Sequence, residues 1–473
     1  MARQPIRFVF GGIDARHTRQ PGNPSTGKNF YIKNQELFTR GGSSLVNTDP
    51  TFASYINTLH SAGKVGVSTR ILTEEGTNLW HSLNGGTTWA KLMDGTVTGS
   101  GFNSCRWQDY LILVSGTKMK AYDIAAGTLA DLGGTPPNLE DVTTWKSYLF
   151  GWAPNYAHSD YLWMCGEDEG ENISKDVWPA TRFLNVGGSI GASVMKMVPC
   201  IDHALILTFK GYYRLLGTPP DLTNLELIYA GNINLYNGRL IAVAADIPIW
   251  LGLEGGYRRI YGYTGTAPLP ISMPIEVYEI LQSYTLTYAR AVGIANQWWM
   301  FIPNTPTAGY TTALVFDTTE REWFIYEFPF VIRSACVYSD YMGREYIYCG
   351  LGTAISSKYI AKLDDSATDA GSVAITTSFT LGPHDIFDAE ITARTLYLQG
   401  YPRNNFTLSI YPRMDNGSEG SAISMAFTTG QPVTQKAPLG TNYGYNLSLR
   451  VTTTDKINSL RKGSITFDEG VRS

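Results

Sequence analysis

Residues 286–328 read LTYARAVGIANQWWMFIPNTPTAGYTTALVFDTTEREWFIYEF. Within this stretch WWMFIP, TALVFD and WFIYEF each mix aromatic with β-branched or aliphatic residues, and short polar segments separate them. Runs of this composition, bounded by turn residues, are typical of β-strands. The stretch therefore predicts a small antiparallel sheet in which each strand pairs with the next.

The same pattern recurs from about residue 52 to about residue 381, in units of roughly 47 residues. Each unit opens with an aromatic and β-branched strand, adds a second strand across a short turn, and closes on a polar hairpin. We place these units at 64–92, 103–132, 141–186, 194–228, 234–263, 286–328 and 334–380. Four short strands per unit at this period indicate a β-propeller blade. We expect seven blades, and because the third and fifth units are irregular, six or eight also fit.

One hairpin within the first unit carries a motif. The segment Ser82-Leu-Asn84-Gly-Gly86-Thr-Thr88-Trp89 matches the Asp-box pattern S-x-D-x-G-x-T-W, with Asn84 in place of the aspartate. An Asx side chain caps the amides of the turn, glycine supplies a positive φ, and the tryptophan packs beneath. The motif is common in sialidase-type propellers, where it is structural, and we expect the same role here.

The last 90 or so residues change rhythm. ITARTLYLQG, NFTLSIYPRM and YNLSLRVTT alternate apolar and polar residues, which predicts five or six strands of a separate antiparallel β-sandwich. The expected organisation is an N-terminal arm and hairpin at 1–50, a propeller at 51–383 and a C-terminal sandwich at 384–473. The strand that closes the propeller ring should come from Arg7–Phe10 or from the hairpin at 29–45.

Composition supports an all-β class. Of 473 residues 43% are hydrophobic, 12% aromatic and only 16% charged, with 48 glycines. The five cysteines (Cys105, Cys165, Cys200, Cys336, Cys349) form no C-x-x-C pair. They predict free thiols in a reducing cytosol, with Cys105, Cys200 and Cys336 buried in strands. No run of 18 apolar residues and no signal-peptide core is present, so we expect no membrane insertion.

Charge is spread unevenly. The net charge of −4 gives no global basic character. Residues 1–40 nevertheless form a basic arm, which is either a solvated tail or a segment that docks on an acidic partner. Its candidate interaction residues are Arg3, Arg7, Arg16, Arg19 and Lys28.

Three segments resemble known functional motifs but lack features that those motifs require. Residues 22–29, GNPSTGKN, lack the Ser/Thr, strand and helix of a phosphate-binding loop. Residues 167–171 lack calcium-loop spacing and are expected to form an exposed loop. In Tyr257-Arg258-Arg259-Ile-Tyr261 the two arginines point to opposite faces of one strand, whereas a sialidase arginine triad needs three blades. We therefore expect no catalytic, cofactor or metal site, and no enzyme.

Several stretches resemble the propeller-bearing tail nozzle or hub proteins of short-tailed bacteriophages. They are Gly11-Gly12-Ile13, Arg40-Gly41-Gly42, Gly134-Thr-Pro-Pro137 leading into Trp145–Gly151, Tyr161-Leu-Trp163, Asp176-Val-Trp178-Pro179, and Ala204–Phe209 ending at Lys210-Gly211. The pattern of LSIYPRMDNG and LSLRVTTTD near the C-terminus is also similar. The chain departs from the larger members by lacking a long inserted tip domain.

The resemblance implies a structural virion protein that forms a homohexameric ring below the portal and adaptor. Such a ring encloses the DNA ejection channel and holds fibres outside, after assembly in the host cytoplasm. Double-stranded DNA would pass without sequence-specific contact, and a mildly negative chain would not grip it. The basic arm would dock on an acidic neighbouring subunit.

Two other classes stay open. A glycan-binding or glycan-cleaving propeller is suggested by the Asp box, and it predicts Arg or carboxylate side chains from several blades converging at one mouth. A non-viral adaptor propeller predicts partner binding without a ring.

Overall fold

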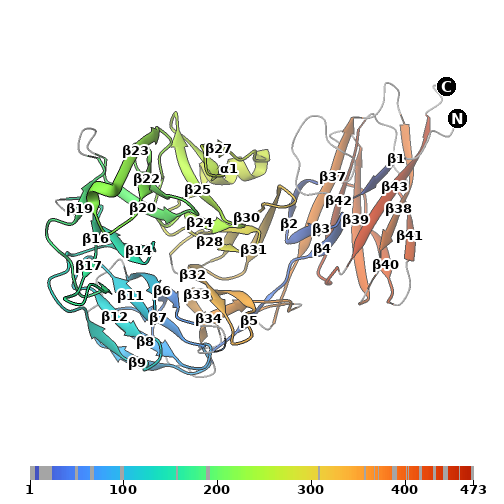
Figure 1. The fold of residues 1–473 in the computed structure, drawn as a ribbon. Helices are drawn as coiled ribbons and strands as arrows, with labels where there is room; N and C mark the ends of the chain where they lie inside the picture. Colours follow the sequence, from blue (N-terminus) through green and yellow to red (C-terminus); the bar gives the residue numbers. More distant parts are fainter. Residues whose placement is uncertain are drawn as a thin grey trace.

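The computed structural model places the propeller and the sandwich side by side (Figure 1). It describes residues 6–9, 24–47, 52–63, 66, 69–95, 101–155, 158–187, 192–306, 309–355, 358–366, 368–370, 372–385, 391–400, 402, 404–414, 418–429, 433–439, 446–457 and 459–469. In this part of the chain, nearly all regular structure is antiparallel β-sheet.

Seven four-stranded sheets make up the propeller in the described residues, and we number them as blades 1 to 7. Blades 1 to 3 are β6–β9 (Ile56–Ser61, Ile71–Glu75, Asn78–Ser82, Ala90–Met93), β10–β13 (Asn103–Trp107, Tyr110–Val114, Lys120–Asp123, Leu129–Asp131), and β14, β15, β16 and β19 (Asp141–Trp145, Tyr148–Trp152, Tyr161–Met164, Phe183–Asn185). Blades 4 and 5 are β20–β23 (Val194–Pro199, Ala204–Thr208, Tyr212–Gly217, Leu225–Gly231) and β24–β27 (Ile241–Ala244, Ile247–Glu254, Tyr257–Tyr263, Pro268–Pro270). Blade 6 is β28–β31 (Arg290–Ile294, Gln297–Pro303, Thr311–Asp317, Glu322–Phe328). The predicted seven-bladed propeller is confirmed.

Blade 7 closes the ring. Its sheet has the order β32 (Ile332–Ser339), β33 (Glu345–Ile355), β34 (Lys358–Leu363) and β5 (Ser43–Leu45). The outermost strand therefore comes from the N-terminal part of the chain, where Leu45 pairs with Ala361. The closing strand falls at the end of the predicted 29–45 segment, directly after its hairpin. Arg7–Phe10 does not serve, because β1 (Ile6–Val9) pairs elsewhere.

The second strand of most blades shows why this sequence stacks as sheets. In β7, β11, β15 and β21 four or all five residues are buried, because both faces of the strand pack against neighbouring blades. β11, β15 and β21 read as nearly continuous apolar runs, in contrast to half-exposed strands that alternate, whereas β7 ends in Thr73, Glu74 and Glu75. The first predicted unit, 64–92, does not include the inner strand β6. The reason is that β6 carries Asn, Thr and His among its apolar residues and does not read as an apolar run.

Short elements decorate the ring. A hairpin, β17 (Gly166–Glu167) with β18 (Ile173–Ser174), extends blade 3, and a 3₁₀ turn (Leu222–Asn224) precedes β23. Helix α1 (Ile275–Ser283) links blades 5 and 6 and buries Val277 and Leu281. A two-stranded ladder, β35 (Thr368–Asp369) with β36 (Val373–Ala374), follows blade 7.

The sandwich draws on both ends of the chain. One sheet has the order β3 (Phe30–Lys33), β4 (Glu36–Thr39), β43 (Leu460–Glu469), β38 (Ile391–Gly400) and β41 (Val433–Pro438), with β1 also on β43. The other has the order β2 (Pro24–Lys28), β37 (Thr377–Asp385), β42 (Asn446–Thr453), β39 (Phe406–Met414) and β40 (Ile423–Phe427). The predicted sandwich and its period of two are confirmed, as in the alternating burial of β39.

The expected domain limits need correction. Residues 24–39 are not an independent arm and hairpin but strands of the sandwich, and 377–383 belong to the sandwich rather than to the propeller. The physical reason is burial: Phe30, Ile32 and Leu37 insert into the apolar core that the C-terminal strands leave open. This core is continuous with that of blades 5 to 7, since one cluster includes Phe30, Trp298 and Leu449.

Candidate functional site

The Asp-box turn lies between β8 and β9 and has the expected geometry. The Asn84 Oδ1 atom accepts a hydrogen bond from the Thr88 amide at 2.9 Å, and the Ser82 hydroxyl accepts one from the Gly86 amide at 2.8 Å. Gly86 has a φ of +92°, which a side chain would strain. The Trp89 indole donates to the Gly86 carbonyl at 2.9 Å. All five predicted residues therefore build one turn.

This turn also fastens the ring. The Gly85 carbonyl accepts a hydrogen bond from the Tyr348 hydroxyl of blade 7 at 3.1 Å, and the Tyr338 hydroxyl donates to the Thr69 carbonyl at 3.2 Å. A Cβ atom on Gly86 would lie 3.1 Å from Val46, which follows the closing strand β5. The Asp-box turn thus packs against the seam between blades 1 and 7.

The predicted basic arm is only partly described. Arg3, Arg16 and Arg19 lie outside the described residues. The backbone of Arg7 pairs with Ser464 in β43. The Lys28 ammonium lies 2.6 Å from the Glu327 carboxylate of β31, and both side chains are about two-fifths exposed. Lys28 therefore meets an acidic group of its own chain, and docking of the arm on a neighbouring subunit stays a prediction.

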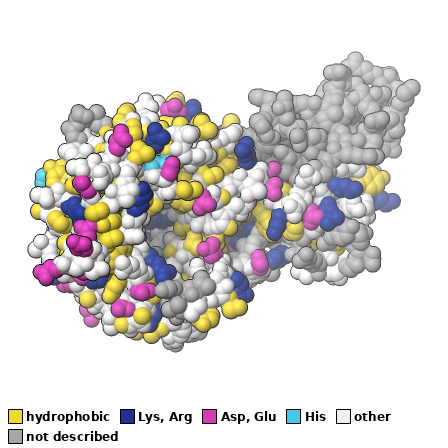
Figure 2. All heavy atoms as spheres, in the orientation of Figure 1, with side chains coloured by type: hydrophobic (Ala, Val, Ile, Leu, Met, Phe, Trp, Pro, Cys, Tyr) yellow, Lys and Arg dark blue, Asp and Glu magenta, His cyan; other side chains and the backbone are white. Residues whose placement is uncertain are grey.

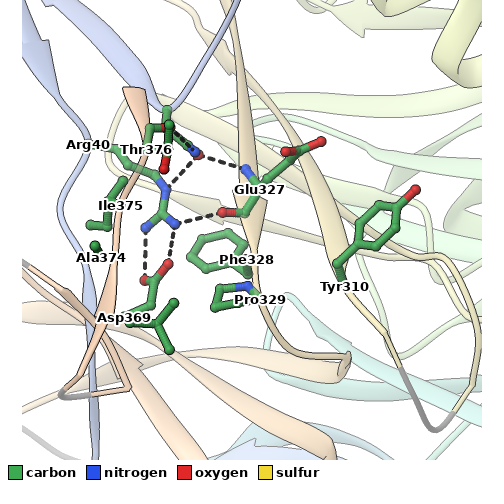
Figure 3. A pocket seen from close by; sticks show the side chains of 11 residues that line it. Arg40, Tyr310, Glu327, Phe328, Pro329, Asp369, Ala374, Ile375 and Thr376 are labelled. Atoms are coloured by element: carbon green, nitrogen blue, oxygen red, sulfur yellow. Dashed lines mark hydrogen bonds and ion pairs between the residues drawn. The ribbon is translucent and has the colours of Figure 1, made fainter. Parts of the chain in front are cut away.

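A buried arginine joins the sandwich to blade 6. Arg40, at the end of β4, is 2% exposed and forms a salt bridge with Asp369. Its Nε donates to Asn29 Oδ1 at 2.9 Å, and its Nη atoms donate to the Gly41 and Glu327 carbonyls as well as to Asp369. Figure 3 shows the guanidinium between the Asp369 carboxylate and the Glu327 backbone, with the Phe328 ring beside it.

Asn29 completes this joint. Its backbone N–H donates to the Ile325 carbonyl at 2.8 Å, and its side-chain oxygen accepts from the Glu327 amide at 2.7 Å. A φ of +62°, which asparagine tolerates better than most residues, turns the chain between β2 and β3 so that both bonds form. Asn29, Arg40 and Asp369 thus fix the sandwich against the outer strand of blade 6.

A cavity of about 340 Å³ adjoins the joint, lined by residues of both parts, among them Asn29, Arg40, Tyr310 and Asp369 (Figure 3). Two described cation–carboxylate pairs lie at the cavity, Arg40 with Asp369 and, at its rim, Lys28 with Glu327. Within each pair the opposite charges neutralise each other. The cavity therefore marks where two parts are held together.

Charged side chains of six blades also gather at one end of the central channel, where the inner strands begin. Links between adjacent blades place these starts together: Lys196 Nζ lies 2.7 Å from Asp141 Oδ2, and the Ala291 amide donates to the Arg239 carbonyl at 2.9 Å. We call this end the channel mouth and define it by Glu74, Asp141, Lys196, Arg239, Arg290 and Arg333. Figure 2 shows the propeller hollowed near its centre, with Lys, Arg, Asp and Glu side chains around the hollow.

Burial and neighbouring charges shift pKa values at the mouth. Burial raises the pKa of the Glu74 carboxyl to about 7, although the Phe102 amide donates to it at 2.6 Å. Burial also lowers the pKa of Arg290 to about 9, and the like charges of Arg239 and Arg333 add to that shift. These residues were not among the predicted site residues, although arginine stands at or next to the first strand in three successive units, as GRLIAV, ARAVGI and IRSACV.

The three segments that resembled functional motifs in the sequence make hydrogen bonds, ion pairs or strands within the fold. Arg258 donates to the Leu281 and Tyr284 carbonyls at the end of α1, and Arg259 pairs with Glu254 at the surface. Asp168 caps the β17–β18 turn through the Gly170 and Asn172 amides, as expected for an exposed loop. Residues 24–28 of the GNPSTGKN segment form strand β2.

The five cysteines are free thiols. Cys165 and Cys349 are fully buried, whereas Cys105, Cys200 and Cys336, which were predicted to be buried, are partly buried, and burial raises the pKa of all three thiols. Among the described residues no group of three or more His, Cys, Asp or Glu side chains is placed to hold a metal ion. No helix in the described part of the chain is long and apolar enough to cross a bilayer.

Comparisons with known proteins give structural neighbours and no sequence relatives. No protein-family model and no curated protein matches the chain. BamB from Moraxella catarrhalis shares 8% identity, with 76% of this chain and 97% of that chain covered and a TM-score of 0.39. A chain of the Mitotic Checkpoint Complex shares 8% identity, with 75% and 99% covered and a TM-score of 0.40. The seven four-stranded sheets of the chain itself identify it as a β-propeller, joined to a sandwich that both ends of the chain build.

Proposed function

We propose that this chain is a structural, non-enzymatic component of a short-tailed phage tail, which assembles as a ring around the DNA ejection channel. Its neighbours in the virion would be the portal and adaptor complex and the tail fibres. The sequence resemblance suggests this class, and the observation that supports it most is the buried Arg40–Asp369 joint.

The joint matters because a ring subunit must present its contact surfaces in a fixed relative orientation. A loose link between propeller and sandwich would lose conformational freedom on assembly and so weaken the ring. A buried ion pair with additional hydrogen bonds, set in one continuous apolar core, removes that freedom in advance. The chain is thus built as one body rather than as two tethered domains.

Blade 5 and helix α1 offer a surface for such contacts. Tyr257, Leu269 and Ile275 are 57%, 61% and 59% exposed, and β26 links them, since Leu269 pairs with Gly262 and α1 packs on the same strand. Tyr257 begins β26 and Leu269 pairs near the other end of that strand, so the exposed apolar side chains are spread along this part of blade 5, where a partner surface would cover them. We place one face of the subunit interface there.

Negative-stain electron microscopy of the purified protein, alone and with phage-particle lysate as template, tests this function. Rings with a central hole are expected, and Leu269→Glu should abolish them. Met342→Glu serves as the matched control, because Met342 is 74% exposed in a turn of blade 7. Isolated monomers under every condition, template included, would contradict the proposal.

A glycan-binding or glycan-cleaving propeller is the second candidate, and one observation favours it. Charged side chains from several blades converge at the channel mouth, as that class requires. A glycan array and a glycoside hydrolysis assay distinguish the two candidates, since a purely structural subunit gives no signal in either.

A further inference from the structure

The basic side of the channel mouth is made of three arginines from consecutive blades. Arg290 begins β28 in blade 6, Arg333 is the second residue of β32 in blade 7, and Arg239 directly precedes β24 in blade 5. The three guanidinium groups lie close enough for their charges to interact, with Arg290 between the other two. The charge of Arg239 also interacts with those of Glu74 and Asp141, on blades 1 and 3. A side chain that reaches groups on blades 1, 3 and 6 from blade 5 must project toward the channel axis.

Two of these arginines are held in place by their surroundings. The Arg333 guanidinium carbon lies 3.9 Å from the centre of the Tyr55 ring and 5.5 Å from that of Tyr288. Stacking on aromatic faces fixes a guanidinium while leaving its edge N–H groups free to bind. The turn that presents Arg239 is shaped by Asn237, whose side chain accepts a hydrogen bond from the Arg239 amide at 2.9 Å.

Arg290 keeps most of its hydrogen-bonding capacity. In the described part of the chain its guanidinium donates one hydrogen bond, from Nη1 to the Ala289 carbonyl at 2.9 Å, and forms no ion pair. A guanidinium has five N–H donors, so four remain. Arg290, Arg333 and Arg239 are all partly exposed, and a solute in the channel can therefore reach them.

We propose that Arg290, with Arg239 and Arg333 on either side, binds an oxyanion at the channel mouth, as a carboxylate or phosphate group of a small ligand. Guanidinium groups suit this ligand because their paired N–H donors match two oxygens of a carboxylate or phosphate. The anion would offset the mutual repulsion of three like charges.

The opposite side of the mouth defines how the ligand lies. Glu74, Glu140 and Asp141 face Arg239 across the channel, and Lys196 is paired with Asp141. Ionised carboxylates repel an anion, and those of Glu140 and Asp141 lie at the start of blade 3, so the oxyanion binds on the side of blades 6 and 7. This site does not depend on the tail role, because a chain that forms no rings can still bind an anion.

Binding to the full-length protein is the test, with inorganic phosphate and glucuronic acid as the two probes. Isothermal titration calorimetry and thermal unfolding are measured at constant ionic strength, with chloride replaced by the probe. At least one probe should bind the wild type and raise its Tm above the value in chloride. Arg290→Gln should weaken binding at least about tenfold, because a charge-assisted hydrogen bond contributes that order of affinity. Preference for phosphate or for glucuronic acid identifies the source of the oxyanion.

Two further variants keep the result interpretable. Arg333→Gln should also weaken binding, whereas Arg106→Gln should bind as the wild type does, because Arg106 lies near the opposite end of inner strand β10. Circular dichroism and the Tm in chloride establish that each variant is folded. Equal affinity of folded Arg290→Gln and wild type, or no response of the wild type to either probe beyond that to chloride, would overturn the proposal.

Discussion

Two arginines of this chain, Arg40 and Arg290, differ in burial and in the number of hydrogen bonds that they donate. Arg40, between the sandwich and blade 6, is 2% exposed and uses its Nε and both Nη atoms on Asn29, Gly41, Glu327 and Asp369. Arg290, at the channel mouth, has one described hydrogen bond and two positively charged neighbours. A guanidinium that is fully paired and buried holds a fold together, whereas one that is crowded by like charges and reached by solvent gains stability when an anion binds.

The largest effect is expected at the joint. Arg40→Gln should lower the free energy of unfolding by about 3–5 kcal/mol, because it leaves the buried Asp369 carboxylate without its partner. Chemical denaturation measures this loss. The double variant Arg40→Met, Asp369→Leu should lose less than the single one, since it removes both buried charges. A loss below about 1 kcal/mol in Arg40→Gln would show that the pair is not what holds the two parts together.

Glu74 should show the next largest effect, and its sign depends on pH. Its folded-state pKa is raised from 4.5 to about 7, so the folded state holds the proton more tightly than the unfolded state. The contribution of Glu74 to stability is therefore highest below about pH 4.5 and falls as pH rises through about 7. Among the described residues no hydrogen-bond partner meets the geometric criteria for its buried Oε2 atom, as expected for a carboxyl that carries a proton.

Glu74→Gln removes this titration while keeping an acceptor for the Phe102 amide. At pH 8 the variant should be more stable than the wild type by about 2–3 kcal/mol, with little difference at pH 4. Unfolding free energies measured across that range check the trend. A wild type and a variant whose stabilities run parallel from pH 4 to pH 8 would contradict the buried, protonated Glu74.

The Asp-box turn should be intermediate. Gly86→Ala is expected to cost about 2 kcal/mol, because its φ of +92° strains a side chain and the new Cβ would lie 3.1 Å from Val46. Gly76→Ala is the matched control and should cost about 1 kcal/mol, because Gly76 has a φ of +58° and no atom of the described residues lies within 4 Å of the Cβ that alanine would add. Thermal unfolding of the two variants separates backbone strain from the contact with the ring seam. Equal losses of stability would show that the contact with Val46 does not add to the cost of Gly86→Ala.

The smallest effect is expected at the surface. Lys28→Gln breaks a pair with Glu327 in which both side chains are substantially exposed, and should cost less than about 1 kcal/mol. The loss of stability should shrink further at high salt, because dissolved ions screen the attraction between exposed charges. A loss comparable to that of Arg40→Gln would mean that Lys28 also belongs to the joint.

Local patterns in the sequence predicted the fold well, but partners distant in the sequence were harder to find. The aromatic runs predicted the blades, and the motif at Ser82–Trp89 predicted its turn, because both depend on neighbouring residues. The pairing of β5 with β34 and the entry of Phe30 into the sandwich join segments more than 300 residues apart, and no local pattern reports them. The arginines at the channel mouth could be predicted in part. Aligning the repeats places them at equivalent positions, but the sequence of one unit does not show that their side chains lie near one another.

The most direct test of the contrast is thermal unfolding of Arg40→Gln and Arg290→Gln beside the wild type, in chloride and in phosphate or glucuronate at equal ionic strength. The account predicts that Arg40→Gln loses stability in chloride and keeps the rise in Tm that the bound probe gives. It predicts that Arg290→Gln is as stable as the wild type in chloride, or more so, and loses that rise. An Arg290→Gln variant as destabilised as Arg40→Gln, or one that keeps the full rise, would contradict the assignment of one arginine to the fold and the other to a ligand.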